Sequence, residues 1–444
     1  MAIEICTVGG YSEVGKNMIA VKVDDEVVVL DMGLDLDPYI KYTDDDDVHD
    51  MSAYALTKIG AIPDISLIKD WKKKVVAIIP THAHLDHVGA IPYLSNKFTA
   101  PILATPFTAE VLRRICDNEK IKLKNNVKQL NVNSTHRVTD GITIEFVNMC
   151  HSTPQAVTVV IHTKYGAVVY ATDFKFDNHP VLGKKCNVER LKEIGNEKVV
   201  CLILDALKAR VDSKTPSETV AKEMLKDVML CTESEGKAII VTTFSSHLAR
   251  LKSIIDFGKH LNRKIVFLGR SLAKYVEAGE DIGIVNFTKD VEICRFAKHV
   301  HRKLKKINKE KEKYLIVCTG HQGESKAILS RIVRGDFDFK LEKEDHVIFS
   351  CTVIPNSLNR ANRELLEKNL KQNGARIFKD IHVSGHPGRE DLRDMVNIIK
   401  PEHVIPCHGD IEFASGLSTL LEEMGFKLGE EVHIMTDGQR LKFD

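Results

Sequence analysis

Apolar and polar positions alternate in short runs along the first half of the chain. The runs Ile3 to Val8, Ile19 to Val23 and Val27 to Leu30 are separated by Gly or Asp-Asp turns, which is typical of β-strands joined by tight turns. One helix is expected in this half, from Pro106 to Asp117. Further apolar runs predict more strands, at Val75 to Pro80, Ile142 to Val147, Val157 to Thr163, Ala167 to Ala171 and Val199 to Leu204. The pattern predicts a β-rich region that ends near Asp205.

From about residue 210 the pattern changes to alternating helices and strands. Helices are expected at 217–231 and 246–261, and short apolar runs between and after them predict strands at 238–244, 265–268, 314–318 and 347–351. This alternation is typical of an α/β unit. After about 377 the style of the first half returns, so we predict an inserted domain at 210–376 within a domain made of 1–209 and 377–444.

Composition adds few constraints. Hydrophobic residues make up 43% and charged residues 28%, as in ordinary globular proteins, and the net charge of +1 gives no global attraction to nucleic acid. A basic surface must therefore be local. The segment 298–313 holds eight Lys or Arg and two Glu, which indicates either a solvated helix face or a rim that attracts RNA.

Cysteine usage and hydropathy bear on location. The ten cysteines include no C-x-x-C pair, and we find no secretory leader pattern, which favours reduced thiols in the cytoplasm. No stretch of about 18 apolar residues occurs, so we expect no membrane span.

A cluster of metal-ligating residues follows the predicted strand at 75–80. The segment Thr81 to His87 contains His82, His84, Asp86 and His87, more donors than one tetrahedral catalytic ion takes from one segment, so the spacing suggests two ions. If the preceding run is a strand, His82 and His84 leave it on the same side, because side chains alternate along a strand, while Asp86 and His87 belong to the next turn or helix. A chance group of adjacent histidines is the alternative interpretation.

Two other residues stand at the ends of predicted strands. His151 closes the run that begins at Phe146, and Asp173 follows the run that ends at Thr172. Each alone is more typical of a cap or turn. Together with the histidine cluster they supply a third ligand for one ion and an oxygen donor able to bridge two, as a two-metal hydrolytic site requires. His408 is a further candidate from the far end of the chain.

In this order, Asp31, the H-x-H-x-D-H segment, His151 and Asp173 resemble the motifs of the metallo-β-lactamase superfamily. Asp205, His386 in Ser-Gly-His and His408 in Cys-His-Gly resemble the three extra motifs of the β-CASP nucleases. Within that group the chain is most similar to the ribonuclease J family of the archaeal type, through the segments 9–18, 244–250, 269–271, 319–324 and 382–386.

The resemblance implies an α/β fold: a metallo-β-lactamase αββα sandwich with an inserted α/β β-CASP domain. It further implies that His82, His84 and His151 bind one Zn2+, that Asp86, His87 and His408 bind a second, that Asp173 bridges them, and that Asp31 orients a ligand. Two departures from the family motifs are visible. The first extra motif commonly reads Asp-Ser-Thr in this family and reads Asp205-Ala206-Leu207 here, and a family Ile-Pro-Gly-Asn segment reads Ile354-Pro355-Asn356-Ser357 here.

The implied activity is that of a zinc-dependent ribonuclease in RNA decay and processing, a 5′-to-3′ exonuclease on single-stranded RNA with or without endonuclease activity. The catalytic candidates are His386 as general acid, Asp205 as its orienting partner, and Asp86. A homodimer is also expected. The candidate RNA contacts lie in two motifs and in the inserted domain: His382, Val383, Ser384, Gly385, His386, Ser245, Ser246, Arg270, Ser271 and Gln322.

Other functions remain as alternatives. An endonuclease of the 3′-end-processing type shares the extra motifs, an inactive RNA-binding scaffold would lack metal ligands, and a small thioester or lactam hydrolase would not need the insertion. The segment Gly10 to Asn17 nearly spells a nucleotide-binding P-loop, but Asn17 stands where Ser or Thr is required and a strand follows. We therefore expect no nucleotide cofactor.

Overall fold

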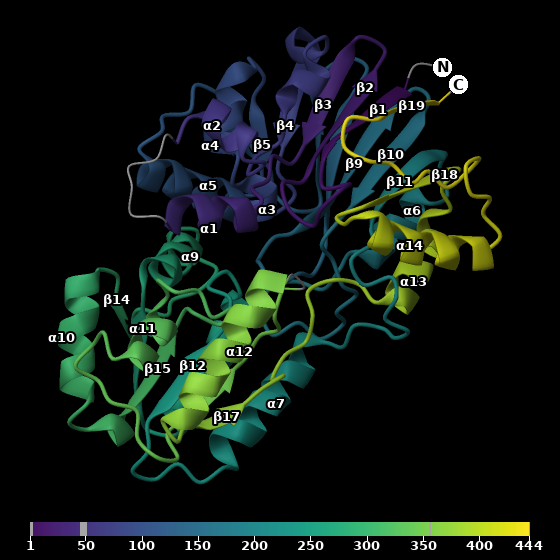
Figure 1. Ribbon diagram of the computed structural model, residues 1–444. Helices are drawn as coiled ribbons and strands as arrows, with labels where there is room; N and C mark the ends of the chain where they lie inside the picture. Colours follow the sequence, from purple (N-terminus) through teal and green to yellow (C-terminus); the bar gives the residue numbers. More distant parts are fainter. Residues whose placement is uncertain (1–2, 45–50, 355–356, 444) are drawn as a thin grey trace. The chain divides into compact units, whose positions relative to one another are not determined.

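The computed structural model describes residues 3–44, 51–354 and 357–443. The chain forms two compact units (Figure 1). The first contains Met1–Asn178, Lys184–Thr215 and Ser384–Asp444, and the second contains His179–Gly183 and Pro216–Val383. The second unit is therefore an insertion in the sequence of the first.

Two mixed sheets form the centre of the first unit. One has seven strands in the order β19 (Arg440–Phe443), β1 (Ile3–Gly9), β2 (Met18–Val23), β3 (Glu26–Leu30), β4 (Val75–Ile79), β5 (Ile102–Ala104), β6 (Val127–Gln129). The other has six, in the order β18 (His403–Cys407), β11 (Val199–Asp205), β10 (Gly166–Ala171), β9 (Val157–Thr163), β8 (Thr143–Asn148), β7 (Ser134–Arg137).

The core of this unit lies between the sheets and beneath the helices on either side. Inward-facing residues such as Ile5, Val21, Phe146 and Ile203 form one apolar cluster between the two sheets. A second cluster joins the six-stranded sheet to α6 (Val188–Ile194), α13 (Arg389–Ile399) and α14 (Ile411–Glu423). The other sheet has helices along its outer side: α1 (Leu36–Asp44), α2 (Ala53–Lys58), α3 (Leu85–Val88), α4 (Ile91–Leu94) and α5 (Pro106–Glu119). This is the predicted αββα sandwich.

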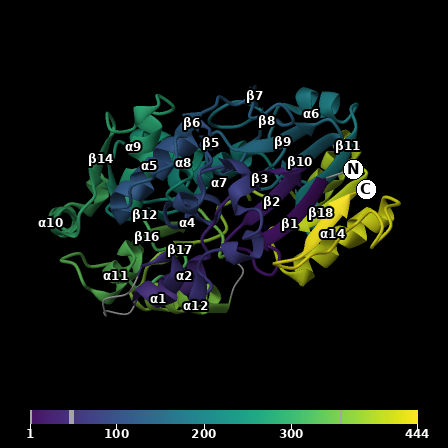
Figure 2. The ribbon, with the colours of Figure 1, turned by 90° about the horizontal axis from the view of Figure 1, so that it is seen from above.

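The second unit has one sheet whose strands all run parallel, in the order β14 (Val291–Cys294), β13 (Lys264–Leu268), β15 (Tyr314–Cys318), β12 (Ile239–Thr242), β16 (His346–Phe349), β17 (Arg376–Phe378). Near-continuous apolar strands such as Tyr314–Cys318 are buried on both faces, as a parallel sheet requires. The helices are α7 (Glu218–Leu230), α8 (Leu248–His260), α9 (Arg270–Asp281), α10 (Ala297–Ile307), α11 (Ile328–Arg334) and α12 (Ser357–Gln372). Figure 2 shows the same elements from above.

Most predicted elements are present. The strands expected at 157–163 and 314–318 have the predicted bounds, and the expected helix at 217–231 is α7. The predicted strand before the histidine cluster is present as β4, but it ends at Ile79, and His82 and His84 lie in the loop that follows, so the alternation of a strand does not orient them. Asp86 and His87 do lie on a helix, α3. No helix among the described residues is long and apolar enough to cross a membrane.

A buried arginine, Arg250, links several segments of the second unit through hydrogen bonds. Arg250 is fully buried on α8, and its Nε and Nη2 donate to the two carboxylate oxygens of Glu218 at 2.6 and 3.0 Å. Its Nη1 donates to the carbonyl oxygens of Ser350 at 2.9 Å and Ile381 at 3.1 Å. Arg250 thereby connects α7, the end of β16 and the segment that leads into the motif at 382–386.

We predict that Arg250→Met lowers the free energy of unfolding by about 3 to 5 kcal/mol, because it removes both charge-assisted hydrogen bonds that Arg250 donates to the buried Glu218 carboxylate. Urea denaturation followed by circular dichroism measures the change. Arg113→Met is the control: Arg113 is 54% exposed and pairs with Glu110 and Asp117, so its loss should cost less than about 1 kcal/mol. Equal effects of the two substitutions would contradict the prediction.

Candidate metal centre

The candidate site residues gather because parallel strands end at one edge of each sheet. Asp173 follows β10, Asp205 ends β11 and His408 follows β18, three neighbouring strands that run parallel. In the other sheet, Asp31 follows β3, and the loop with His82 follows the parallel β4. Carboxyl ends of parallel strands face the same way, so these side chains meet at one edge of the sandwich.

Three of these residues have left-handed backbones directly after their strands. The φ angles are 58° at Asp31, 48° at Asp173 and 63° at His408. Asp and His are among the residues that tolerate this region, but it is unfavourable for any residue with a Cβ atom. Strained conformations of this kind persist where surrounding contacts impose them, and they concentrate at functional sites.

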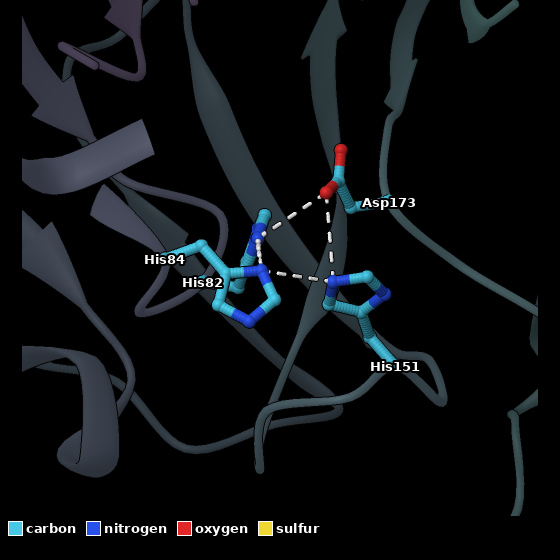
Figure 3. Close-up of side chains that lie close together, drawn as sticks. All are labelled: His82, His84, His151 and Asp173. Atoms are coloured by element: carbon cyan, nitrogen blue, oxygen red, sulfur yellow. Dashed lines mark hydrogen bonds and ion pairs between the residues drawn. The ribbon is translucent and has the colours of Figure 1, made fainter. Parts of the chain in front are cut away.

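Three imidazoles and one carboxylate form the first group of candidate ligands (Figure 3). His84 Nδ1 lies 3.1 Å from His82 Nε2 and 3.0 Å from His151 Nε2. Asp173 Oδ2 lies 3.5 Å from the same two Nε2 atoms. Four ligand atoms thus surround one point.

The second group shares Asp173 with the first. Its other oxygen, Oδ1, lies 3.3 Å from His87 Nε2 and 3.6 Å from His408 Nε2. Asp86 Oδ2 lies 3.5 Å from His87 Nε2 and 3.9 Å from His408 Nε2. Asp173 therefore directs one oxygen to each group, which is the arrangement of a bridging carboxylate.

The distances fit zinc. Tetrahedral coordination with bonds of 2.0 to 2.2 Å places neighbouring ligand atoms about 3.3 to 3.6 Å apart, close to the observed spacings in both groups. His82, His84 and His151 also have the correct protonation for ligands. Burial lowers the pKa of His84 to about 4 and holds the pKa values of His82 and His151 well below their usual range, which favours the neutral form of all three rings.

Asp31 organises the side chains around it. Fully buried, it accepts hydrogen bonds from the Thr81 backbone at 2.7 Å, from His87 Nδ1 at 2.8 Å and from the Tyr170 hydroxyl at 3.0 Å. The Thr81 hydroxyl lies 3.1 Å from His82 Nδ1. Asp31 thus fixes His87 directly and His82 through Thr81, each with Nε2 toward the cluster.

His151 and His408 are oriented in the same manner, through Nδ1. His151 Nδ1 donates to the carbonyl of Gly385 at 2.9 Å, and a Cβ at Gly385 would lie 2.7 Å from the His151 ring, so only glycine fits there. His408 Nδ1 lies 3.0 Å from Asn17 Oδ1, and Asn17 Nδ2 lies 3.3 Å from His87 Nε2. In both rings Nε2 is left for the centre, as in metal-bound histidines.

Negative charge accumulates at this edge. Burial opposes the charged form of His87, but the carboxylates of Asp173, Asp31 and Asp86 outweigh it and raise the pKa of His87 well above its usual value. Burial likewise raises the pKa of Asp173, yet the facing histidines, His408 first, hold that pKa well below its usual range. Two divalent ions bound here would balance the negative charge of these buried carboxylates.

A third pair stands beside the two groups. His386 Nδ1 donates to Asp205 Oδ2 at 2.9 Å, and its Nε2 lies 3.8 Å from Asp173 Oδ2. The His386 side chain is 20% exposed, whereas Asp205 is fully buried. The backbone N–H of Leu207 donates to Asp205 Oδ1 at 2.8 Å, so a main-chain donor holds this carboxylate in place.

The candidate RNA contacts of the second unit follow three neighbouring parallel strands. Ser245 and Ser246 follow β12, Arg270 and Ser271 begin α9 after β13, and Gln322 follows β15. Arg270 and Ser271 are exposed. Gln322 is buried; its amide donates to the Thr352 carbonyl at 3.1 Å and accepts from the Ile354 N–H at 3.0 Å. This position favours a structural role for Gln322, and its contact with RNA stays a prediction.

The motif at 382–386 spans the end of one unit and the start of the other. His382 and Val383 belong to the second unit, and Ser384, Gly385 and His386 belong to the first. The Ser384 hydroxyl accepts a hydrogen bond from the His386 N–H at 3.0 Å, which stabilises the turn that presents His386.

Sequence reasoning missed Asn17, Thr81 and Tyr170 as parts of the site. Tyr170 and Thr81 act through hydrogen bonds whose partners are known only from the fold. Asn17 carried a signal, since it lies in the Gly-rich segment 9–18 that supports the family resemblance.

Three family models match consecutive parts of the chain. A β-lactamase superfamily domain matches residues 64–193, the β-CASP domain of ribonuclease J matches 228–367, and a Zn-dependent metallo-hydrolase RNA specificity domain matches 375–435. A solved structure from Enterococcus faecalis, of a protein of unknown function, covers all of both chains with a TM-score of 0.65 at 17% identity, and shows the same fold.

Relatives that match nearly the whole chain identify the family within this superfamily. Ribonuclease J of Methanocaldococcus jannaschii is 44% identical over 100% of this chain and 99% of its own. Ribonuclease J of Pyrococcus abyssi is 42% identical over 98% and 96%, and ribonuclease J 1 of Streptococcus pyogenes is 31% identical over 99% and 74%. The fold and site thus define a metallo-β-lactamase-type protein with an inserted β-CASP domain. Within this class the chain belongs to the ribonuclease J family.

We predict that Asp31→Ala weakens the binding of divalent metal about 10- to 100-fold, because it releases His87 and Thr81 together. Competition with a chromophoric chelator measures the affinity. Tyr170→Phe removes only one of the hydrogen bonds to Asp31 and keeps the ring, so we expect a smaller effect. Unchanged affinity in Asp31→Ala would show that Asp31 does not orient ligands.

Proposed function

We propose that this protein is a zinc-dependent ribonuclease that hydrolyses RNA phosphodiesters, with 5′-to-3′ exonuclease activity on single-stranded RNA. The observation that carries the proposal is Asp173, whose two oxygens face two separate ligand groups beside the His386–Asp205 pair. Ribonuclease is the activity named for the relatives that match the whole chain.

The donor set supports two Zn2+ ions. His82, His84 and His151 would hold one, Asp86, His87 and His408 the other, and Asp173 both. Five imidazoles among seven ligands favour zinc over manganese or magnesium, which prefer oxygen donors. When bound, the ions would supply a water of lowered pKa and positive charge for the scissile phosphate.

His386 is our candidate for the general acid. Burial lowers its pKa, but the carboxylates of Asp173 and Asp205 outweigh burial and raise the pKa above its usual value, which favours the protonated ring that a general acid needs. Asp205 accepts from Nδ1, which leaves the Nε2 proton for the departing 3′-oxygen. We assign the proton of the attacking water to Asp86, the most exposed carboxylate of the two ligand groups at 26%.

The contacts with RNA are proposed on the motifs. Arg270 and Ser271 stand at the N-terminus of α9, a 12-residue helix, where free N–H groups and the helix dipole favour a phosphate. Ser245, Ser246 and the segment 382–386 complete the proposed grip on the strand. All ten cysteines are free thiols, which supports a reducing cytoplasmic location; assembly as a homodimer stays a prediction.

We predict that the protein releases mononucleotides from the 5′ end of a single-stranded RNA, faster with a 5′-monophosphate than with a 5′-hydroxyl, because an anionic end suits the cationic N-terminus of α9. End-labelled RNAs of one sequence, resolved on a gel, give the product sizes. Chelation of the metal, or His84→Ala, should abolish cleavage.

Each other result has a distinct meaning. Internal fragments without mononucleotides would replace the exonuclease with an endonuclease. Full activity of metal-free protein or of His84→Ala would contradict the metal mechanism, and intact RNA with a zinc-loaded protein would leave an RNA-binding scaffold.

We predict that Asp205→Asn shifts the alkaline limb of the kcat profile to lower pH by about 1 unit or more. Asp205 raises the pKa of His386, so without its charge the imidazole loses its proton at lower pH, and activity falls earlier as pH rises. Stopped assays across pH 6 to 10 measure the limb. His386→Gln should lower kcat about 10²- to 10⁴-fold with metal content unchanged. An unmoved limb in Asp205→Asn would exclude His386 as the acid.

A further inference from the structure

One exposed side of helix α10 carries a row of basic residues. The segment Ala297–Ile307 contains five Lys or Arg and no acidic residue. Lys298, Arg302 and Lys306 follow one another at intervals of four, so they form a row along one side of the helix, and all three are exposed. In Figure 1 and Figure 2, α10 lies beside β14, the edge strand of the parallel sheet.

The row is not neutralised by the protein. Two other cations of the helix have acidic partners: Lys303 pairs with Glu292, and Lys305 with Asp338 at 3.1 Å. Lys298, Arg302 and Lys306 have no carboxylate partner in the parts of the chain that the structure describes. Their charges are therefore free to attract an external anion.

Helix stability does not account for this row. Like charges four residues apart repel each other, and Lys298 stands in the first turn, where the helix dipole disfavours a cation. A surface helix selected only for stability would alternate its charges. An anionic partner explains the arrangement, because it would turn mutual repulsion into shared attraction.

The other face of α10 distinguishes between two anionic partners, a lipid membrane and a nucleic acid. Its apolar residues Val300, Leu304 and Ile307 are buried in the core of the second unit, so they cannot enter a lipid bilayer. Phe296, at the start of the helix, is 56% exposed. An exposed aromatic ring at the N-terminal end of a helix that carries a row of cations offers both contacts that single-stranded nucleic acid uses, stacking on bases and pairing with phosphates.

We propose that α10 and Phe296 form an accessory binding surface for single-stranded RNA, separate from the metal centre. This inference rests on the proposed ribonuclease function. Side chains four residues apart on a helix are about 6 Å apart along its axis, comparable with the distance between neighbouring phosphates of an extended strand. We expect this surface to bind RNA without sequence preference, because its cations contact the phosphates of the RNA backbone and not the base edges. It increases the affinity of the enzyme for long substrates.

The test compares the salt dependence of RNA binding. The probe is a nuclease-resistant 2′-O-methyl phosphorothioate oligouridylate of about 20 nucleotides, longer than one compact binding site needs. Fluorescence anisotropy across a range of salt gives the slope of log Kd against log salt. We expect Lys298→Gln/Arg302→Gln/Lys306→Gln to reduce this slope by about 2, since each phosphate contact on a single strand contributes about 0.7. Phe296→Ser should weaken binding about tenfold without changing the slope.

The matched control is Lys69→Gln/Lys72→Gln/Lys73→Gln. These lysines are also exposed and have no acidic partner among the described residues, and their loss changes the net charge equally. A slope in the α10 variant equal to that of wild type or of the control overturns the proposal. The proposal is also overturned if the α10 variant loses binding to anionic lipid vesicles while its RNA binding is unchanged. Because the probe is not cleaved, a failure of the ribonuclease function appears only in the cleavage assay.

Discussion

The candidate centre depends on the burial of several carboxylates at one edge of a β-sandwich. Asp31, Asp173 and Asp205 are almost completely shielded from water, and each ends or follows a strand. Buried charge is tolerated only with matching charge and hydrogen bonds. This requirement accounts for the surrounding imidazoles, for the raised pKa of His87 and for the fit to divalent cations.

The sandwich supplies the rigidity that such a cluster needs. Loops from different strands are joined by backbone hydrogen bonds, such as Asn17 N–H to the Asp86 carbonyl at 3.0 Å and Met32 N–H to the His87 carbonyl at 2.9 Å. These contacts hold the left-handed backbone at Asp31, which an isolated loop would not adopt. Each candidate ligand is thus held by its own strand and by hydrogen bonds from neighbouring loops.

The sequence predicted those parts of the structure whose signal is local. Buried strands such as β9 and β15 were found by their apolar runs, whereas β7 and β17, short and partly exposed, lack such runs and were missed. The candidate ligand residues stood out because His and Asp in this order are distinctive, and the structure brings them together in two groups. The sequence pattern placed Asn17 in a segment that resembles an incomplete P-loop. Its partner His408 lies 391 positions away in the chain, so no local pattern could indicate this contact.

Two kinds of positive charge in this protein illustrate one rule. Arg250 is buried, so its partners must come from the chain, and Glu218, Ser350 and Ile381 supply them. Lys298 and its neighbours on α10 are exposed, where water stabilises each charge and a partner is not required for folding. Exposed cations of one sign can therefore remain unpaired in the folded protein and still be available to a polyanion. The same physics makes the buried charges structural and leaves the exposed row free for binding.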